Sequence, residues 1–203
     1  MKIVIKLGGS ITFNKQGPDY EYISKLIPVI KEVQKKHAVT LVVGGGKFVE
    51  VYAKDAKKLG LSNEQIEWLY IDLLKANTRL FSYLLPGIKV VGGIKPGQNT
   101  DTNAALEAAK QQSSLLIKLT DTNGLYDKDP DFHKDAKFLN KISYKDIDKI
   151  VQKKTGPKNY GILSPSAARI IEKNKIRVVV VGKDQNNILK ILAGKKIGTE
   201  ISE

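Results

Sequence analysis

Two short apolar runs that end directly in glycines constrain the fold of this chain more than any other feature. Residues 3–5, Ile-Val-Ile, lead through Lys6 and Leu7 into two glycines, and residues 41–43, Leu-Val-Val, lead into three. A short β-branched run followed by glycines predicts a strand that ends in a tight loop. Backbone N–H groups in such loops can face an anion, and Lys6 adds a positive charge beside the first loop. The two junctions together indicate a chain built to hold phosphates.

Helix and strand patterns then alternate to the end of the chain. Apolar spacing, start signals and stop signals predict helices over residues 19–36, 48–59, 62–85, 101–111, 143–151, from Ser164-Pro165 onward, and 186–193. Buried strands are predicted over residues 38–43, 90–91, 115–119 and 177–181, with an edge strand over 198–202. Ser62 and Gln65 form a capping box, and Thr100 is the expected N-cap of the helix that begins at Asp101. Residues 153–161 are basic and contain glycine, so we expect them to be mobile.

Strands that alternate with helices imply a mainly parallel sheet covered by helices on both faces. We therefore predict an α/β protein, a three-layer αβα sandwich with a mainly parallel central sheet, in which residues 1–203 form a single domain. Ligands of such sheets bind beyond the carboxyl ends of the strands. The glycine loops, Asp101, Thr120 and Asp121 all follow predicted strands, so we expect them to gather at one edge of the sheet.

The composition excludes several classes of protein. The chain has no cysteine, which rules out disulfides and thiolate metal sites, and it has no apolar stretch as long as a membrane span. The first residues form a strand rather than a signal peptide, because no long apolar region follows Lys2. We therefore expect a cytoplasmic protein that has no membrane partner.

The net charge of +13 raises the alternative of a nucleic-acid-binding protein. Only three of the 34 basic residues are arginine, and the lysines are scattered along predicted helices, as on solvated helix faces. Nucleic-acid-binding surfaces favour arginine and interleaved aromatic residues. We expect no nucleic-acid partner, because a basic protein that handles anionic nucleotides needs no polymer to explain its charge. Binding to RNA with a steep salt dependence would favour the alternative.

Several common nucleotide and metal motifs are missing from the sequence. Gly46-Lys47 is followed by Phe48, where a P-loop needs Ser or Thr to reach magnesium. No G-x-G-x-x-G pattern occurs at a strand-to-helix turn, which argues against a dinucleotide fold. The two histidines, His37 and His133, lie in charged surroundings. We interpret them as surface residues rather than as metal ligands or members of a catalytic triad.

Two further segments carry groups that suit nucleotides. Residues 92–101 form a glycine-bearing loop that leads into a helix start, where backbone donors and the helix dipole can hold a second anion. On its own this segment is better explained as an ordinary capped loop. Residues 119–130 supply hydroxyls, carboxylates and one aromatic ring. Such groups can contact the base and the ribose hydroxyls of a nucleoside.

Five segments carry a resemblance to a known family: KLGGS, VVGGGK, GGIKPGQNTD, TDTNGLYDKDP and SPSAARII. In this order they are similar to the amino acid kinase superfamily over nearly the whole chain, and the third and fourth are most similar to archaeal-type UMP kinases. The resemblance implies the amino acid kinase fold and MgATP-dependent transfer of a γ-phosphoryl group to UMP, giving UDP. It also implies ATP and Mg2+ as cofactors, small-molecule nucleotides as partners, and a homo-oligomer such as a hexamer.

The resemblance implies roles for individual residues as well. Lys6 would neutralise charge on the transferring phosphoryl group, and Asp101 matches an aspartate that orients the catalytic lysines in sibling kinases. The implied ATP-binding residues are Gly8, Gly9, Ser10, Gly45, Thr120, Asp121, Tyr126 and Asp129. The implied UMP-binding residues are Gly44, Glu67, Ile94, Lys95, Pro96, Gly97, Gln98, Asn99 and Thr100. No dedicated metal ligand is assigned, because nucleotide oxygens and water are expected to hold the Mg2+ ion.

Departures from the family pattern leave the identity of the phosphoryl acceptor open. Glu50 stands where the family carries an arginine, and Tyr70 stands where it carries a glycine. Glu67 and Ser164 both stand where the family carries an aspartate, and the segment before Val90 is shorter than in the relatives. Two alternatives follow. The chain would be a kinase of another small phosphorylated or carboxylated acceptor, or a non-catalytic nucleotide-binding regulator on the same fold.

Overall fold

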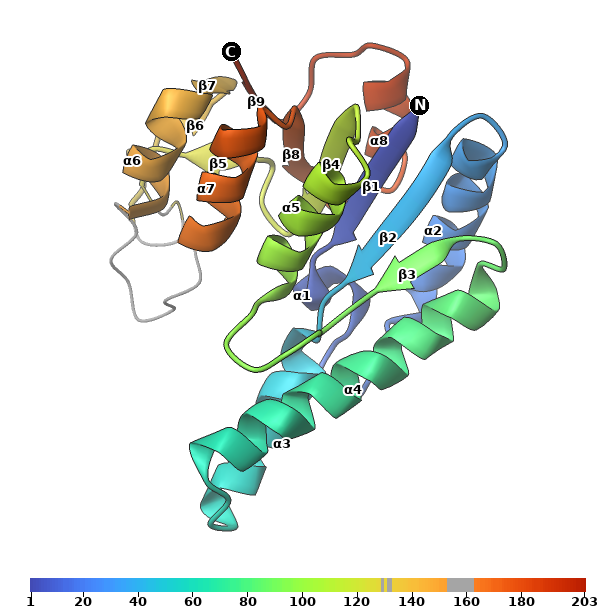
Figure 1. The fold of residues 1–203 in the computed structure, drawn as a ribbon, viewed down its shortest axis with the longest axis vertical. Helices are drawn as coiled ribbons and strands as arrows, with labels where there is room; N and C mark the ends of the chain where they lie inside the picture. Colours follow the sequence, from blue (N-terminus) through green and yellow to red (C-terminus); the bar gives the residue numbers. More distant parts are fainter. Residues whose placement is uncertain (129, 131–132, 153–162) are drawn as a thin grey trace.

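The computed structural model describes all residues except 129, 131–132 and 153–162. In the described chain, a seven-stranded sheet forms the centre of the molecule (Figure 1). The strand order is β3-β2-β1-β4-β8-β9-β7. Its strands are β1 (Lys2–Leu7), β2 (Ala38–Val43), β3 (Lys89–Val91), β4 (Leu115–Thr120), β7 (Lys141–Ser143), β8 (Val178–Gly182) and β9 (Thr199–Ser202).

Neighbouring strands of this sheet run parallel, apart from the pair β8–β9. The predicted mainly parallel sheet is therefore confirmed. The prediction that residues 198–202 form an edge strand is wrong, because β9 lies between β8 and β7. The edge beyond β9 is formed by β7, whose three residues are too few to show the pattern of a strand in the sequence.

Helices cover both faces of the sheet and give the predicted three-layer sandwich (Figure 1). Residues of α2, α4 and α8 fill a hydrophobic core on one face, and residues of α5, α6 and α7 pack on the other. The helices are α1 (Gly9–Thr12), α2 (Tyr20–Gln34), α3 (Gly46–Lys58), α4 (Asn63–Leu84), α5 (Thr100–Lys110), α6 (Ile147–Gln152), α7 (Pro165–Asn174) and α8 (Asn187–Leu192), with a 3-10 turn, η1, over Tyr144–Asp146.

The pleat of β1 decides which side chains reach which layer. Ile3, Ile5 and Leu7 belong to the core beneath α2, whereas Val4 belongs to the core beneath α5. Side chains alternate between the two faces of a strand, so Lys6 shares the face of Val4. This alternation points the Lys6 side chain toward α5 rather than toward α2.

Helix α3 and the N-terminal half of α4 extend beyond the sheet as a pair, while the C-terminal half of α4 packs on the sheet (Figure 1). A small separate core joins them, made of Ala53 and Ala56 from α3 and Ile66 from α4. The predicted capping box begins α4: Ser62 accepts a hydrogen bond from the Gln65 backbone, and the Gln65 side chain accepts one from the Ser62 backbone. We name this projecting pair of helices the α3–α4 arm.

Some local predictions differ from the structure. The N-cap of α5 is Asn99, which accepts a hydrogen bond from the Thr102 N–H at 2.8 Å, and Thr100 is already helical. Asparagine caps a helix at least as well as threonine, so the two positions were hard to separate in the sequence. The helix predicted over 143–151 is divided into η1 and α6. The expectation for residues 153–161 lies outside the described residues.

Candidate active site

The two glycine loops start opposite each other at the carboxyl ends of β1 and β2. Leu7 and Val43 are paired in register, so the residues that follow them meet directly. A Cβ atom added to Gly9 would overlap the Gly46 nitrogen and lie 2.8 Å from Gly46 Cα. A Cβ atom added to Gly44 would lie 2.8 Å from the Gly9 nitrogen. The loops therefore touch backbone to backbone, which is a packing that side chains would prevent.

Further contacts hold this junction of loops in place. Gly46 has a φ of +69°, a left-handed conformation that favours glycine. The Gly8 N–H donates to the Leu119 carbonyl at 2.9 Å, which ties the first loop to β4. From α4, the buried Asn77 side chain donates to the Gly44 carbonyl at 3.3 Å. The expected phosphate-binding residues Gly8, Gly9, Gly44 and Gly45 are thus brought together at one edge, with Ser10 exposed on α1.

A buried cluster of three charged side chains lies at the same edge of the sheet. Lys6 Nζ is 3.1 Å from Asp101 Oδ1, and Lys118 Nζ is 2.6 Å from the same oxygen. The side chains of Lys6, Lys118 and Asp101 are 8%, 6% and 15% exposed. Two cations therefore share one carboxylate in a site where solvent screening is weak.

Secondary structure explains why these three residues meet. Lys6 and Lys118 are register partners in the parallel pair β1–β4, and both lie near the carboxyl ends of their strands. Asp101 belongs to the first turn of α5, the helix that covers this face of the sheet. An aspartate is stabilised at a helix N-terminus, and the two lysines reach it from below.

The surroundings change the pKa values of Asp101 and Lys118. Burial on its own would raise the pKa of the Asp101 carboxyl, but the charges and hydrogen bonds of Lys118 and Lys6 outweigh it and leave this pKa below its ordinary value. Burial lowers the pKa of Lys118 to about 8; the Lys6 charge acts in the same direction, and Asp101 opposes both. Asp101 is therefore a carboxylate at neutral pH, whereas Lys118 loses its proton under mildly alkaline conditions.

Lys118 was not singled out by the sequence analysis, although the sequence carries a signal for it. It interrupts an otherwise apolar buried strand, as Lys6 does in β1. A lysine is seldom buried unless it is paired. Two such strands in one chain indicate two buried cations with a shared anion, and that pattern could have found Lys118.

The loop expected to bind the acceptor phosphate, residues 94–100, joins β3 to α5. It is fixed at its helix end by the Asn99 cap and by Gln98, whose side chain donates to Asn103 Oδ1. The buried Asn103 side chain in turn donates to the Gly92 carbonyl at 2.7 Å. Ile94, Lys95 and Gly97 are exposed, while Pro96, Gln98, Asn99 and Thr100 are half-buried. The loop is thus braced from within and open to solvent along one side.

The residues expected to bind the ATP nucleoside follow β4. Thr120 is buried and donates to Asp121 Oδ1 at 3.1 Å, and a Cβ atom on Gly8 would be 3.7 Å from Thr120 Cα. Tyr126 lies in a two-stranded hairpin, β5 (Leu125–Tyr126) with β6 (Phe138–Leu139), that the sequence analysis did not predict. Its ring meets the Phe138 ring edge-on at 5.3 Å between centroids. Asp129 lies outside the described residues.

Glu67 occupies a different place from the other expected acceptor-binding residues. It is exposed in a groove of about 490 Å³ between α3 and α4, which Glu50 and Tyr70 also line. A Cβ atom on Gly45 would touch Val49 and Leu74, and one helical turn further out the facing residues are Ala53 and Tyr70. This α3–α4 groove therefore begins about one turn away from the second glycine loop.

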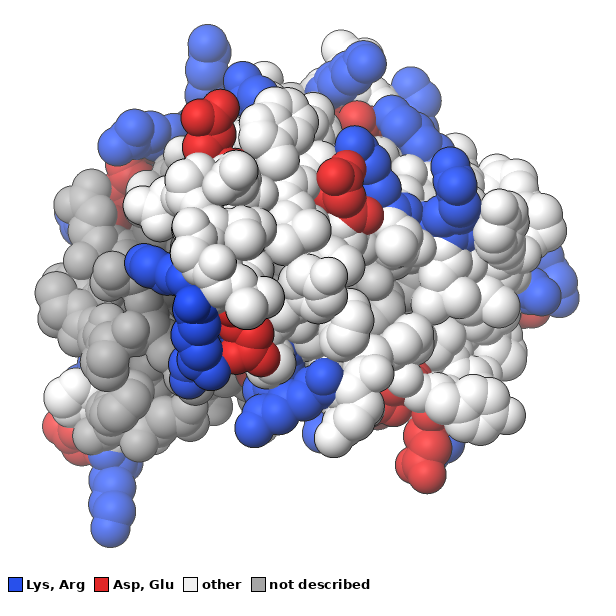
Figure 2. Space-filling model, turned by 90° about the horizontal axis from the view of Figure 1, so that it is seen from below, with Lys and Arg blue, Asp and Glu red and all other residues white. Residues whose placement is uncertain are grey.

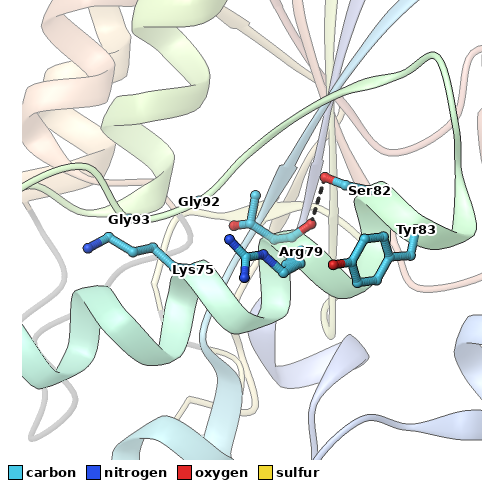
Figure 3. Close-up of a pocket in the computed structure, with 7 residues that line it drawn as sticks. Lys75, Arg79, Ser82, Tyr83, Gly92 and Gly93 are labelled. Carbon is cyan, nitrogen blue, oxygen red and sulfur yellow. Dashed lines mark hydrogen bonds between the residues drawn. The ribbon is translucent and has the colours of Figure 1, made fainter.

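A second groove, of about 390 Å³, lies where α4 meets the loop after β3. Figure 3 shows Lys75, Arg79 and Tyr83 along α4 there, with Gly92 and Gly93 beside them. Neither groove is lined by Lys6, Asp101 or Lys118. The grooves flank α4, while the charged cluster lies beneath α5.

On the face that Figure 2 shows, the charged side chains are not gathered into one stripe. In the view from below in Figure 2, Lys and Arg side chains are spread over the face, and Asp and Glu side chains lie among them. In the part of the chain that the structure describes, no three His, Cys, Asp or Glu side chains form a group that could hold a metal ion. Among the described helices, none is long and apolar enough to cross a membrane.

Glycine loops that meet beside a buried lysine–aspartate cluster, at the carboxyl ends of parallel strands, define an α/β protein of the phosphate-binding class. The chain belongs to the amino acid kinase family, whose model matches residues 1–93 and 73–182.

The similarity to known proteins extends over the whole chain. A uridylate kinase from Sulfurisphaera tokodaii is 32% identical over 225 aligned residues, and one from Thermococcus kodakarensis is 30% identical over 224; the match covers 99% of each chain in both cases. The crystal structure of uridylate kinase from Archaeoglobus fulgidus superposes with a TM-score of 0.89 at 29% identity, covering 100% of both chains. An aspartate kinase from Synechocystis, at 17% identity and a TM-score of 0.73, shares the fold over 40% of its own chain and 100% of this one.

Proposed function

We propose that this chain catalyses transfer of the γ-phosphoryl group of ATP to UMP, giving ADP and UDP. The observation that carries the proposal is the buried Lys6–Asp101 ion pair of 3.1 Å at the strand ends where two glycine loops meet. The full-length similarity to proteins named uridylate kinase supports UMP as the acceptor.

Phosphoryl transfer needs placement and charge stabilisation more than covalent chemistry. A phosphate oxygen of UMP forms a bond to the γ-phosphorus while the bond from the γ-phosphorus to the β–γ bridging oxygen breaks, and ADP leaves. The acceptor phosphate is already ionised, so no side chain has to remove a proton from it. In this proposal Lys6 stabilises negative charge on the transferring group, and Asp101 orients the Lys6 ammonium.

The binding roles follow the two sides of the junction of glycine loops. We assign the ATP phosphates to the first loop and to Gly45, and the ATP nucleoside to the segment after β4. We assign the UMP phosphate to Gly44 and to the braced loop of residues 94–100. The residues that we propose to bind ATP are Gly8, Gly9, Ser10, Thr120, Asp121 and Tyr126. Asp129 is proposed to bind ATP on the basis of the sequence alone.

Magnesium fits this site as part of MgATP. Asp101, the buried carboxylate of the cluster, is already bonded to two lysines, and the described residues provide no group of three ligands for an ion. Phosphate oxygens and water would therefore make up most of the ion's coordination shell. The ion would neutralise phosphate charge, and the chain's own contribution would remain Lys6 and the glycine loops.

We further propose that residues 1–203 work as one catalytic domain, since the strands of a single sheet run from residue 2 to residue 202. We also propose a homo-oligomer, following the resemblance to the family, and a cytoplasmic location, where ATP and UMP occur together. Light scattering at two protein concentrations would test the oligomer. A single species at the monomer mass of 22.4 kDa would contradict it.

A coupled assay of ADP release tests the proposed activity. The wild-type chain is incubated with MgATP and, separately, with UMP, CMP or a small carboxylate. We expect ADP release to rise well above the acceptor-free rate with UMP. If the chain binds ATP but no acceptor raises ADP release, the result would contradict the proposal and support the nucleotide-binding regulator.

A second candidate function, a kinase of another acceptor, is favoured by the α3–α4 groove. Glu50 and Glu67 place two carboxylates on its lining, and Tyr70 adds a phenol ring. Carboxylates accept hydrogen bonds and repel phosphate, so this lining favours an acceptor with donor groups at the end distant from its phosphate. In the same assay, a kcat/KM for CMP or a carboxylate above that for UMP would support this candidate.

A further inference from the structure

We infer that Lys118 is a positioning residue that neutralises Asp101, so that Lys6 can direct its charge to the transferring phosphoryl group. This inference rests on the proposed phosphoryl transfer. It assigns different tasks to two lysines that share one carboxylate oxygen. Lys118 would stay with Asp101 throughout the reaction, whereas Lys6 would exchange part of its contact with Asp101 for a phosphate oxygen.

The geometry distinguishes the two lysines. Lys118 Nζ is nearer to Asp101 Oδ1, at 2.6 Å, than Lys6 Nζ is, at 3.1 Å. Lys6 is two residues before Gly8, in the strand that leads into the first glycine loop. Lys118 lies in β4, where Leu119 accepts the hydrogen bond of Gly8 and Thr120 follows. Lys6 is therefore the lysine whose strand leads directly into the phosphate loop.

The charges of the cluster explain why a second lysine is needed. With Lys6 and Asp101 alone, the pair would be neutral and would offer little attraction to an anion in a site of low dielectric constant. Lys118 makes two cations against one anion, so the cluster keeps one net positive charge. That charge stabilises the phosphoryl group only when Lys118 is protonated.

The groups that face Lys118 from its surroundings set its protonation. Asp101 faces it from α5 and favours the charged form, and Asp121, just after β4, acts in the same sense. Lys6 faces it from β1 and favours the neutral form, as burial does. The balance leaves the pKa of Lys118 at about 8, so the net charge of the cluster falls to zero above this pH.

The experiment compares wild type with Lys118→Met, Asp101→Asn and the double variant. Methionine has nearly the length of lysine and suits a buried strand, so we expect Lys118→Met to fold. Lys2→Met, which removes an exposed lysine from the far end of β1, is the matched control for charge. The turnover number and kcat/KM for ATP are measured from pH 6 to pH 10, and ATP affinity is measured by calorimetry without acceptor over the same range.

We expect Lys118→Met to lower kcat at pH 7 by about tenfold to a hundredfold, and to lose a decline in kcat/KM for ATP that wild type shows above pH 8, because kcat/KM reports the pKa values of the free enzyme. The double variant should be several-fold faster than Lys118→Met, because removing the Asp101 charge restores the net charge that Lys118 supplied. ATP affinity should fall above pH 8 in wild type and Lys2→Met but stay flat in Lys118→Met.

Two results would overturn the inference. One is a Lys118→Met variant with kcat within twofold of wild type and the same alkaline decline in kcat/KM for ATP. The other is a double variant no faster than Lys118→Met, which would make Lys118 a direct ligand of the phosphates or a structural residue. If wild type transfers phosphate to no acceptor, the proposed function fails, and the pH dependence of ATP affinity still decides the role of Lys118.

Discussion

At the scale of single residues, the contact between Gly9 and Gly46 limits what the phosphate loop tolerates. A Cβ atom at Gly9 would overlap the Gly46 nitrogen, and backbone cannot move aside as a flexible side chain can. We predict that Gly9→Ala destabilises the fold by about 3 kcal/mol, the upper part of the range for overpacking. Urea denaturation of both proteins measures the difference. Ser10→Ala, one residue on and exposed, should stay within about 0.5 kcal/mol, and equal stability of all three proteins would contradict the close contact.

Lys6 is the residue on which the proposed chemistry depends most. We predict that Lys6→Met lowers kcat by about a hundredfold to a thousandfold, as removal of a single electrostatic contact to a transition state does. Lys118 still pairs with Asp101 in this variant, so the fold should persist. Steady-state kinetics and the circular dichroism melting curve measure both quantities.

The control for this prediction is Lys2→Met in the same strand, which should keep the wild-type turnover number. A folded Lys6→Met protein with unchanged kcat would remove Lys6 from the catalytic centre. A loss of kcat in Lys2→Met of the same size would show that the assay reports overall charge instead.

At the scale of elements, the hairpin that carries Tyr126 depends on one threonine of a distant strand. Thr199, fully buried in β9, accepts a hydrogen bond from the Leu125 N–H at 2.8 Å and donates to the Leu139 carbonyl. Thr199→Val keeps the shape but leaves both groups without this partner. We predict a loss of stability of about 2 kcal/mol and a higher KM for ATP, with kcat nearly unchanged.

Hydrogen exchange of the hairpin amides and steady-state kinetics test this prediction. The expected pattern is a larger acceleration of exchange at Leu125 in Thr199→Val than in the β1–β4 pair, where exchange should accelerate only as far as global stability falls. Ser202→Ala, three residues later in β9, is the control, because its hydroxyl bonds the Glu203 carbonyl and the Glu200 carboxylate, neither of which belongs to the hairpin. Unchanged exchange at Leu125 would show that Thr199 does not hold the hairpin.

The same hairpin shows what the sequence could and could not predict. The central strands and long helices were predictable because each carries its own period and its own caps, as the Ser62–Gln65 box does for α4. The strands β5 and β6 have two residues each, and they are held by Thr199, which is 60 residues or more away in the chain. A pattern within a short window contains no trace of such a partner.

The candidate site likewise contains some residues that the sequence could bring together and others that it could not. The glycine loops and Asp101 follow strands, so their meeting at one edge follows from the rule for parallel sheets. The pairing of Lys118 with Lys6 requires that β4 lie beside β1, with β2 on the other side, and chain order alone does not give that arrangement. Glu67 lies on the α3–α4 arm, in a groove that no residue of the charged cluster lines.

At the scale of the whole molecule, the buried cluster couples stability to pH in the opposite sense from activity. Lys118 has a pKa of about 8 in the folded chain, below its ordinary value of 10.5. Between these two values the unfolded chain keeps a proton that the native chain has lost. Stability rises with pH wherever the unfolded state binds more protons, so Lys118 contributes stability as the pH rises from 8 to 10.5.

We predict that the free energy of unfolding of wild type gains about 2 kcal/mol relative to Lys118→Met between pH 8 and pH 10, since each unit of pH in this window adds at most about 1.4 kcal/mol. Over the same range kcat/KM of wild type for ATP should decline, because the cluster of the free enzyme loses its net charge. Urea denaturation of both proteins at pH 7, 8, 9 and 10 measures the first quantity, and the difference between them removes the contribution of the other lysines. A difference that stays constant or shrinks as the pH rises would mean that Lys118 keeps its proton in the folded chain, and the alkaline decline in activity would then need another cause.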